Sequence, residues 1–283
     1  MQNPKKYCII SSNCNFGGLL MSSNKRIVVK VGTSTLTHDT GRLNLCRIEK
    51  LVRCLADLKN RGYDVVLVSS GAIGVGLGQL GIHERPHSTK EKQAVAAVGQ
   101  CELMFIYSKI FDEYGLNVAQ ILLTKDVITD SERKENVLNT FEQLFDYASV
   151  IPIVNENDTV SVEEIEFGDN DTMSAVVAKL IGAELLILLS DIDGLYDSDP
   201  HKCEDATLIP VVLKIDDSVK ALAGGAGTSR GTGGMVTKLM AAEIANASGC
   251  DMILANGSNP EILYDIFDGN FKGTLFKKPK IKE

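Results

Sequence analysis

The chain of 283 residues contains no tryptophan, and only 6% of its residues are aromatic. It has no Cys-x-x-Cys pair, and its seven cysteines are an odd number. Disulfide frameworks and zinc sites need paired, closely spaced cysteines, so the sequence predicts reduced thiols that pack as small apolar side chains. The four histidines show no metal-ligand spacing. We therefore expect no dedicated metal site built from protein side chains.

Long hydrophobic runs and an excess of positive charge are also missing. No apolar run approaches the roughly 20 residues of a membrane span, and the apolar stretch near the N-terminus is too short for a signal peptide. These absences predict a cytoplasmic protein without a membrane partner. The net charge of −8 argues against nucleic-acid binding as the main function, because such proteins usually carry a basic face.

The start of the chain differs from the rest. Met21 stands shortly before the first predicted strand. We expect residues 1–20 to be a disordered extension and residues 21–283 to form a single domain, because no Pro/Ser-rich linker divides the chain.

What the sequence does contain is a regular alternation of predicted strands and helices. Apolar, β-branched runs such as Ile27–Val31 and Val65–Val68 predict strands buried on both faces. Between them, apolar residues recur at helical spacing, as in the stretch that Gly62 closes. This alternation predicts right-handed crossovers and a mainly parallel sheet covered by helices on both faces. The other predicted strands are Val118–Leu123, Val150–Val154, Leu185–Leu189, Ile209–Leu213 and Met252–Leu254, and the later predicted helices include Met173–Ile181, Met235–Ala247 and Pro260–Phe267.

Two local signals refine this outline. Thr129 followed by Glu132 matches a capping box and predicts the start of a helix. Pro152 lies inside a predicted strand and cannot donate a ladder hydrogen bond, so one edge of that strand should lack a partner there or be bulged.

Polar residues gather around one strand end and one helix start. In a parallel sheet, ligands bind at the carboxyl ends of the strands. Asn155-Glu-Asn-Asp158 directly follows a predicted strand, and Asp169-Asn170-Asp171 directly precedes an apolar helix. An N-cap would explain one of these residues but not all of them. The cluster therefore predicts a site for a small polar molecule with a positive group, or for a metal.

Two lysines and several glycine-rich loops complete the pattern. Lys30 lies at the end of an apolar strand, where burying its charge is costly, and a Gly-Thr-Ser segment follows it. Ser70 and Gly71 follow the second strand, where small residues let the backbone approach a ligand. Gly231–Gly234 precedes a helix that carries Lys238, so free N–H groups and a lysine converge on a phosphate-sized space. This combination predicts phosphoryl transfer.

One further glycine motif is rejected as a nucleotide signature. Gly76-x-Gly78-x-x-Gly81 formally matches the dinucleotide fingerprint, but it lies beyond the strand end. The acidic residue that the fingerprint requires would be Glu102, which falls in a predicted helix. The Walker A pattern is absent from the chain as well.

Together these motifs resemble the amino acid kinase family and, within it, the glutamate kinases. The resemblance runs from about Lys25 to Phe276. The paired order of Asn-Glu-Asn-Asp and Gly-Asp-Asn-Asp is specific to the glutamate kinases. The segments that carry the resemblance are Val29–Ser34, Ser70–Ile73, Asn155–Asp158, Phe167–Asp171, Asp191–Tyr196 and Gly231–Lys238.

The resemblance implies a three-layer α/β/α sandwich and ATP-dependent phosphorylation of the γ-carboxylate of L-glutamate, the first step of proline synthesis. It implies catalytic roles for Lys30, Asp171 and Lys238, with Mg²⁺ carried by ATP and Asp171 as a candidate contact for it. It assigns ATP binding to Lys30, Ser190, Asp191, Thr232, Gly233, Gly234, Met235, Val236, Thr237 and Lys238. It assigns glutamate binding to Ser70, Gly71, Asn155, Asp158, Asp169 and Asn170.

The chemistry of these residues agrees with that reading. The α-ammonium of glutamate could pair with Asp158 or Asp169, and its α-carboxylate could accept backbone N–H groups near Ser70 or Asn170. The γ-carboxylate is ionised at pH 7, so no general base is needed. Family members are often inhibited by proline, and we expect this inhibition and a homo-oligomer here. Many also add a C-terminal PUA domain, for which too few residues follow Phe276.

Two alternatives stay open. The first is another kinase of the same fold that acts on aspartate, acetylglutamate, carbamate or a nucleoside monophosphate, since substrate discrimination rests on the acidic cluster. The second is a non-catalytic regulator that binds glutamate or a nucleotide. The presence of both Lys30 and Lys238 argues against this second alternative.

Overall fold

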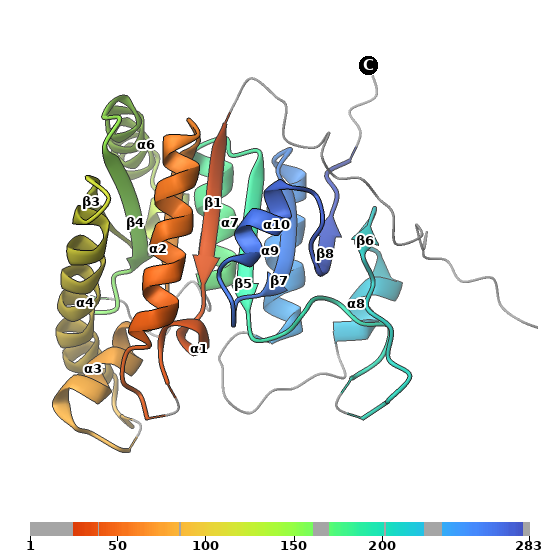
Figure 1. Ribbon diagram of the computed structural model, residues 1–283, viewed down its shortest axis with the longest axis horizontal. Coiled ribbons are helices and arrows are strands. Elements are labelled where there is room, and N and C mark those ends of the chain that lie inside the picture. The colour runs from red at the N-terminus through yellow and green to blue at the C-terminus, as the bar shows by residue number, and fades with distance from the viewer. Residues whose placement is uncertain are drawn as a thin grey trace, which may run out of the picture.

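The computed structural model describes residues 25–279, apart from residues 39, 85, 161–169, 201 and 224–233. In this part of the chain, one sheet has the strand order β3-β4-β2-β1-β5-β7-β8-β6 (Figure 1). Strands β3 to β7 in that order run parallel, whereas β8 is antiparallel to β7 and pairs in parallel with β6. The strands are β1 (Arg26–Val31), β2 (Asp64–Ser69), β3 (Asn117–Leu123), β4 (Val150–Glu156), β5 (Leu185–Ser190), β6 (Val211–Val212), β7 (Asp251–Asn256) and β8 (Gly273–Phe276).

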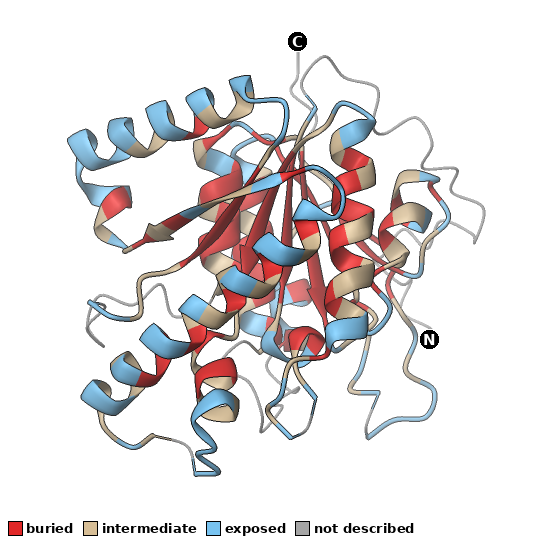
Figure 2. Cartoon of the chain, turned by 60° about the vertical axis from the view of Figure 1, so that its left-hand side comes forward, coloured by how far each residue is buried: buried red, intermediate tan, exposed pale blue. Residues whose placement is uncertain are grey.

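Helices cover both faces of this sheet, so the predicted three-layer α/β/α sandwich is confirmed (Figure 2). The helices are α1 (Thr33–Leu36), α2 (Leu45–Asn60), α3 (Ala72–Leu80), α4 (Thr89–Asp112), α5 (Asp126–Thr129), α6 (Ser131–Asp146), α7 (Asn170–Leu180), α8 (Asp217–Ala223), α9 (Met235–Ala247) and α10 (Ile262–Phe267). One core cluster joins the sheet to α2, α3, α4 and α10, and a second joins its other face to α6, α7, α8 and α9.

The alternation of side chains along β1 decides which face each residue meets. Val29 and Val31 belong to the core cluster under α2, and Val28 belongs to the cluster under α7 and α9. Successive side chains of a strand point to opposite faces, so Lys30 shares the face of Val28. The strand therefore directs its single lysine toward α7 and α9.

The connections of the chain diverge at the centre of the sheet. β1 pairs with β2 on one side and with β5 on the other. Helix α2 links β1 to β2 over one face, and α9 lies between β5 and β7 on the opposite face. The carboxyl ends of β1 and β5 thus form a topological switch point, which is where ligands bind in sheets of this kind.

One local expectation was wrong, and two local features were not predicted. Asp130, and not Thr129, caps α6, because its carboxylate accepts from the backbone N–H groups of Glu132 and Arg133 at 2.9 and 3.1 Å. The capping box that the sequence reading overlooked begins α4, where Ser88 and Glu91 bond reciprocally. Strand β8 was not predicted, because a segment of four residues is too short to show a hydrophobic period.

For Pro152, the first of the two expected outcomes, an edge without a partner, is confirmed. β4 pairs with β3 along its whole length, but its pairing with β2 is confined to Ile153 and Val154, beyond the proline. The missing N–H of Pro152 therefore leaves no broken hydrogen bond in the β2–β4 ladder.

Two glycines of the rejected dinucleotide motif have structural roles in α3. Gly76 lies inside α3, where a Cβ would come within 2.0 Å of the Val95 carbonyl oxygen of α4. Gly81 closes α3 in the left-handed conformation, with φ of 66°. The partner helix α4 is, among the described helices, the one long and apolar enough in composition to cross a membrane, and here it packs on α2 and α3.

Residues 1–20, which we expected to be a disordered extension, lie outside the described residues.

Candidate active site

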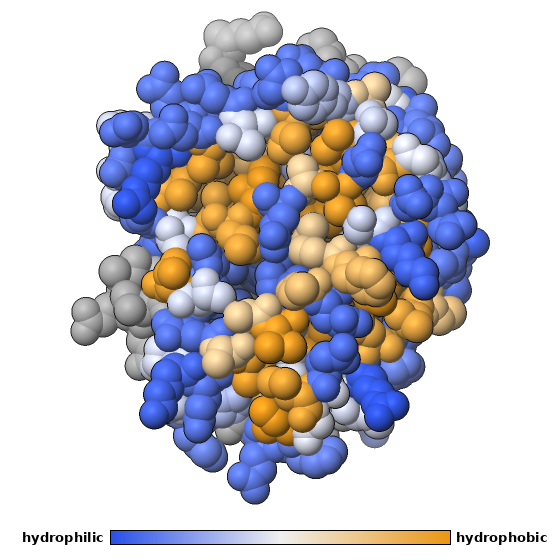
Figure 3. Space-filling view, turned by 90° about the vertical axis from the view of Figure 1, so that its left-hand side faces the viewer, coloured by the Kyte–Doolittle hydropathy of each residue, from blue (hydrophilic) through white to orange (hydrophobic). Residues whose placement is uncertain are grey.

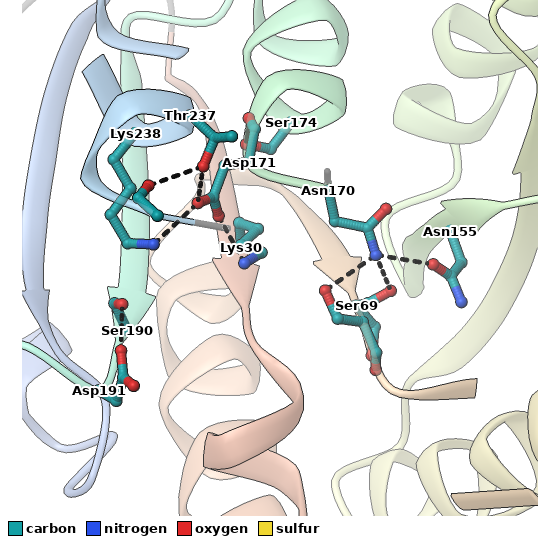
Figure 4. A network of polar contacts seen from close by, with 12 residues as sticks. Lys30, Ser69, Asn155, Asn170, Asp171, Ser174, Ser190, Asp191, Thr237 and Lys238 are labelled. Atoms are coloured by element: carbon teal, nitrogen blue, oxygen red, sulfur yellow. Dashed lines mark hydrogen bonds and ion pairs between the residues drawn. The ribbon is translucent and has the colours of Figure 1, made fainter. Parts of the chain in front are cut away.

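A buried ionic cluster lies at the carboxyl end of β1 (Figure 4). Lys30 Nζ lies 2.5 Å from Asp171 Oδ1, and Lys238 Nζ lies 3.0 Å from Asp171 Oδ2. Lys30, Asp171 and Lys238 are only 6%, 1% and 5% exposed. Two ammonium groups against one carboxylate leave this cluster with a net charge of +1. A buried net positive charge is suited to an anionic ligand, which would complete its neutralisation.

Three elements that are distant in sequence build this lysine cluster. Lys30 comes from β1, Asp171 from the first turn of α7, and Lys238 from the first turn of α9. Helices α7 and α9 pack side by side on the same face of the sheet. Thr237 adds a hydroxyl, which donates to the Gly234 carbonyl at 2.8 Å and lies 3.5 Å from Asp171 Oδ2.

The protonation of Asp171 follows from two opposing effects. Burial alone would raise the pKa of its carboxyl group, but the ammonium groups of Lys30 and Lys238 outweigh burial and hold that pKa below its usual range. Asp171 is therefore ionised at neutral pH and keeps both lysines oriented.

Some of the residues expected to bind the nucleotide are described, and Ser190, Asp191 and the start of α9 lie near this cluster (Figure 4). Ser190 ends β5, is buried, and donates to the carboxylate of the exposed Asp191 at 3.0 Å. Helix α9 begins after Gly234, which supplies no side-chain cap. Its first N–H groups therefore form a positive helix end that suits a phosphate. Met235 is buried and Val236 is exposed, while Thr232 and Gly233 lie outside the described residues.

A second, uncharged cluster of amides and hydroxyls lies near the ends of β2 and β4 (Figure 4). Asn170 Nδ2 lies 2.8 Å from Ser70 Oγ, 3.3 Å from the Ser69 carbonyl oxygen and 3.0 Å from Asn155 Oδ1. Asn155 is buried, and its Nδ2 donates to Gln100 Oε1 at 2.7 Å. We call Ser70, Gln100, Asn155 and Asn170 the amide cluster.

Helix α7 connects the two clusters. Asn170 and Asp171 are consecutive residues in its first turn, and Asn170 joins the amide cluster while Asp171 joins the lysine cluster. An acceptor molecule held by one cluster would therefore lie beside a phosphoryl group held by the other.

Three other predicted substrate residues are not part of the amide cluster. Gly71 is the N-cap of α3 and has φ of 101°, a left-handed conformation that favours glycine. Asp158 lies in the turn after β4 and is half-buried. Asp169 lies outside the described residues.

Sequence reasoning missed Gln100, which belongs to α4 and not to a loop after a strand. The sequence signal for Gln100 was its position as a polar residue directly after the apolar stretch Ala94–Gly99. Tyr107 of the same helix was also missed as a polar contact; its buried hydroxyl lies 3.0 Å from that of Ser69. Burial raises the pKa of the Tyr107 hydroxyl, so this group stays protonated.

The donor set of the site does not favour a metal bound to protein alone. Among the described residues, no three His, Cys, Asp or Glu side chains gather into a potential metal site. Both carboxylate oxygens of Asp171 already face lysine ammonium groups. An ion entering with a nucleotide would meet phosphate oxygens first.

Comparison with known proteins places these features in a family. The family model described as "Amino acid kinase family" matches residues 25–256. The chain is 57% identical to "Glutamate 5-kinase" of Clostridium perfringens, covering 92% of this chain and 98% of that protein. It is 54% identical to "Glutamate 5-kinase" of Listeria innocua, covering 92% of this chain and 95% of that protein.

Solved structures share the fold at low sequence identity. "Carbamate kinase from Giardia lamblia bound to AMP-PNP" aligns with a TM-score of 0.64 and 19% identity, covering 91% of this chain and 100% of that chain. A UMP kinase from Ureaplasma parvum aligns with a TM-score of 0.62 and 14% identity, again covering 91% and 100%.

The lysine cluster, the amide cluster and the switch point thus occur on a fold shared with other kinases, in a sequence more than half identical to glutamate 5-kinases. The chain belongs to the amino acid kinase family, among its glutamate 5-kinases.

Proposed function

We propose that the chain transfers the γ-phosphoryl group of ATP to the γ-carboxylate of L-glutamate and releases ADP and γ-glutamyl phosphate. One observation carries this proposal: consecutive residues of α7, Asn170 and Asp171, connect a neutral cluster suited to an amino acid with a positive cluster suited to phosphates. The identity of 57% to a glutamate 5-kinase supports the choice of substrate. The reaction would be the first step of proline synthesis.

In the transfer step, an oxygen of the γ-carboxylate attacks the γ-phosphorus of ATP. The bond between that phosphorus and the β,γ-bridging oxygen breaks, and its electron pair leaves with ADP. The acceptor is already ionised at neutral pH, so no group has to remove a proton. What the protein must supply is orientation and positive charge around the phosphoryl oxygens.

Lys30 and Lys238 would supply that positive charge. Their ammonium groups are held 2.5 and 3.0 Å from the same aspartate, so both lysines are fixed before a nucleotide binds. Preorganised charge of this kind stabilises the transition state without reorganisation of the site. Asp171 would act mainly by orienting the two lysines.

The remaining site residues divide between the two substrates. Ser190, Asp191 and the segment from Thr232 to Lys238 would bind ATP, and the uncapped start of α9 supports a phosphate contact there. Ser70, Gly71, Asn155, Asp158, Asp169 and Asn170 would bind glutamate, with the carboxylates pairing with its α-ammonium. Mg²⁺ would enter with ATP and shield the charge of its phosphates, with Asp171 as the candidate protein contact.

The test is a kinase assay of the purified chain with ATP and a panel of acceptors: glutamate, aspartate, acetylglutamate, carbamate and UMP. Hydroxylamine traps acyl phosphates, so formation of a glutamyl hydroxamate together with ADP would support the proposal. Phosphorylation of acetylglutamate without phosphorylation of glutamate would overturn the substrate. Binding of ATP without any turnover would favour the non-catalytic regulator.

We further propose that proline inhibits the enzyme at the amino-acid side, since proline shares an α-carboxylate and a charged α-nitrogen with glutamate. Only the membership in the glutamate 5-kinases supports this proposal. Inhibition that more glutamate relieves would agree with it, whereas unchanged rates at high proline concentration would contradict it.

We also propose that the chain forms a homo-oligomer in the cytoplasm. Helix α4 carries an exposed apolar stripe at helical spacing, formed by Ala94, Val98, Cys101 and Phe105, on a face where apolar side chains gather (Figure 3). Such patches mark interaction surfaces. The free cysteines of the described residues suit a reducing compartment. Sedimentation of the wild type and of Phe105→Glu would test the assembly, with a monomeric wild type as the contrary result.

A further inference from the structure

Gln100 makes a contact that the proposed reaction does not yet use. It lies in α4, whereas the other members of the amide cluster lie at the ends of β2 and β4 or at the start of α7. Its Oε1 accepts a hydrogen bond from Asn155 Nδ2 at 2.7 Å, and Asn155 is only 2% exposed. A buried amide hydrogen without an acceptor is costly, so Asn155 depends on Gln100.

Two backbone groups fix the direction in which the asparagine amides point. The backbone N–H of Glu156 donates to Asn155 Oδ1 at 2.9 Å. The backbone carbonyl of Ser69 accepts from Asn170 Nδ2 at 3.3 Å. A backbone N–H only donates and a carbonyl only accepts, so reversing either amide would set like groups against each other.

The orientation of the two asparagine amides also decides whether the Ser70 hydroxyl donates or accepts. Asn170 Nδ2 donates to Asn155 Oδ1 at 3.0 Å and to Ser70 Oγ at 2.8 Å. Since Ser70 Oγ accepts from Asn170, its own hydrogen is directed to an acceptor outside this pair. Ser70 is partly exposed at the carboxyl end of β2. A hydroxyl oriented in this way is a hydrogen-bond donor, which suits a carboxylate oxygen of a ligand.

Close helix packing holds Gln100 in position relative to Ser70. At the preceding residue, Gly99, a Cβ would lie 1.8 Å from the carbonyl oxygen of Ala72 and 2.5 Å from the backbone nitrogen of Gly76. Ala72 is the first residue of α3, two positions after Ser70. The backbones of α3 and α4 therefore touch beside both ends of the hydrogen-bonded chain.

We propose that Gln100 is a positioning residue for the amino-acid substrate, which acts through Asn155 and Asn170 to hold the Ser70 hydroxyl as a donor to a substrate carboxylate. This inference rests on the proposed function. Helix α4, which lies outside the strand-end loops, thereby has a role in recognising a carboxylate of the substrate. The proposed recognition uses oriented neutral dipoles and no positive side chain of the cluster.

The experiment compares Gln100→Met with Gln100→Glu, each in the wild-type and the Ser70→Ala background, and measures kcat and KM for glutamate and KM for ATP. Loss of the acceptor in Gln100→Met should raise the KM for glutamate about tenfold and leave the KM for ATP within about twofold. Gln100→Glu keeps an acceptor oxygen and should stay within about threefold of the wild type. Gln79→Met, an exposed glutamine of α3, is the matched control.

The Ser70→Ala background separates positioning from fold stability. Without the hydroxyl to orient, Gln100→Met should add less than about twofold to the KM, because coupled residues are not additive. Equal effects of Gln100→Met in both backgrounds would overturn the positioning role while leaving the proposed function intact. A wild type that fails to phosphorylate glutamate would overturn both. If Gln100→Met does not fold, Gln100→Ala removes the same acceptor and is measured against the same outcomes.

Discussion

The lysine cluster and the amide cluster meet in one turn of α7, yet they are built on opposite principles. The first places two buried ammonium groups within 3.0 Å of one buried carboxylate and keeps a net charge of +1. The second carries no formal charge and fixes the direction of its two asparagine amides through backbone groups. A strong field suits a phosphoryl group, whose charge is spread over several oxygens. Single hydrogen bonds of fixed direction suit an amino acid, because they distinguish its carboxylate groups, which accept, from its ammonium group, which donates.

The largest expected effect comes from removing a charge of the lysine cluster. Lys238→Ala should lower kcat about 10³-fold or more, because stabilisation of charge developing in the transition state is lost. The KM for glutamate should change by less than about threefold, since the amide cluster is intact. Steady-state kinetics measures both values, and Lys214→Ala, at an exposed lysine, is the control. A kcat within tenfold of the wild type would refute the catalytic role.

Asp171→Asn should reduce stability more than any neutral change in the amide cluster. It leaves Lys30 and Lys238 buried without a counter-charge, which costs about 3–5 kcal/mol. Ser70→Ala, the comparison, should cost about 1 kcal/mol, as for a typical neutral hydrogen bond. Urea unfolding measures both variants. Similar losses of stability in Asp171→Asn and Ser70→Ala would contradict the claim that the lysine cluster depends on charge and the amide cluster does not.

The pH dependence of this stability difference has a definite sign. The folded-state pKa of Asp171 lies below its unfolded value, so its ionic contribution is complete above the unfolded pKa of about 4. The contribution disappears as the pH falls through the lowered folded-state pKa. The stability gap between wild type and Asp171→Asn should therefore be constant at neutral pH and close in acid, which unfolding curves at a series of pH values would detect.

Gly99→Ala would disturb the amide cluster through the backbone. The added Cβ would lie 1.8 Å from the Ala72 carbonyl oxygen, so α4 must move away from α3 at a cost of about 2 kcal/mol or more. The KM for glutamate should rise, because Gln100 moves with the helix. Gly81→Ala is the control: nothing lies within 4 Å of its Cβ, and its positive φ should cost about 1 kcal/mol. Equal losses in thermal or urea unfolding would argue against the close contact.

The smallest expected effect is that of Asp158→Ala. The substrate ammonium would lose one carboxylate partner, which should raise the KM for glutamate about tenfold with kcat nearly unchanged. Asp205→Ala, at an exposed aspartate, is the matched control variant and should leave the KM for glutamate unchanged. A glutamate KM close to that of the wild type would remove Asp158 from the substrate site.

The fold was predictable to a large extent because its signals are local. Helix α9 occupies the predicted residues Met235–Ala247, and β1, β2 and β5 each lie within one residue of the predicted bounds. β6 is shorter than predicted, and the capping residue of α6 was wrong by one position. These errors concern element ends and short elements, where a few contacts outweigh periodicity.

The sequence singled out several of the residues that the structure brings together, but not their contacts. Lys30 stands out in the sequence because a charge is costly to bury in an apolar strand, whereas Asp171 and Lys238 stand out because they follow a polar cluster and a glycine-rich loop. That both lysines contact one aspartate, and that Asn170 bonds Ser70 and Asn155, depends on how α7 and α9 pack on the sheet. The contact of Gln100 could not be found from the sequence, since its partner Asn155 lies 55 positions away on another element.

The sequence by itself determined the alternation of strands and helices, the mainly parallel sheet and the residue types at the strand ends. These properties follow from periodicity, propensity and the cost of burying charge, which act over a few neighbouring residues. Only the tertiary structure decided which of those residues touch. The net charge of the lysine cluster and the direction of the amide hydrogen bonds arise from distances between distant segments, and no local pattern specifies such distances.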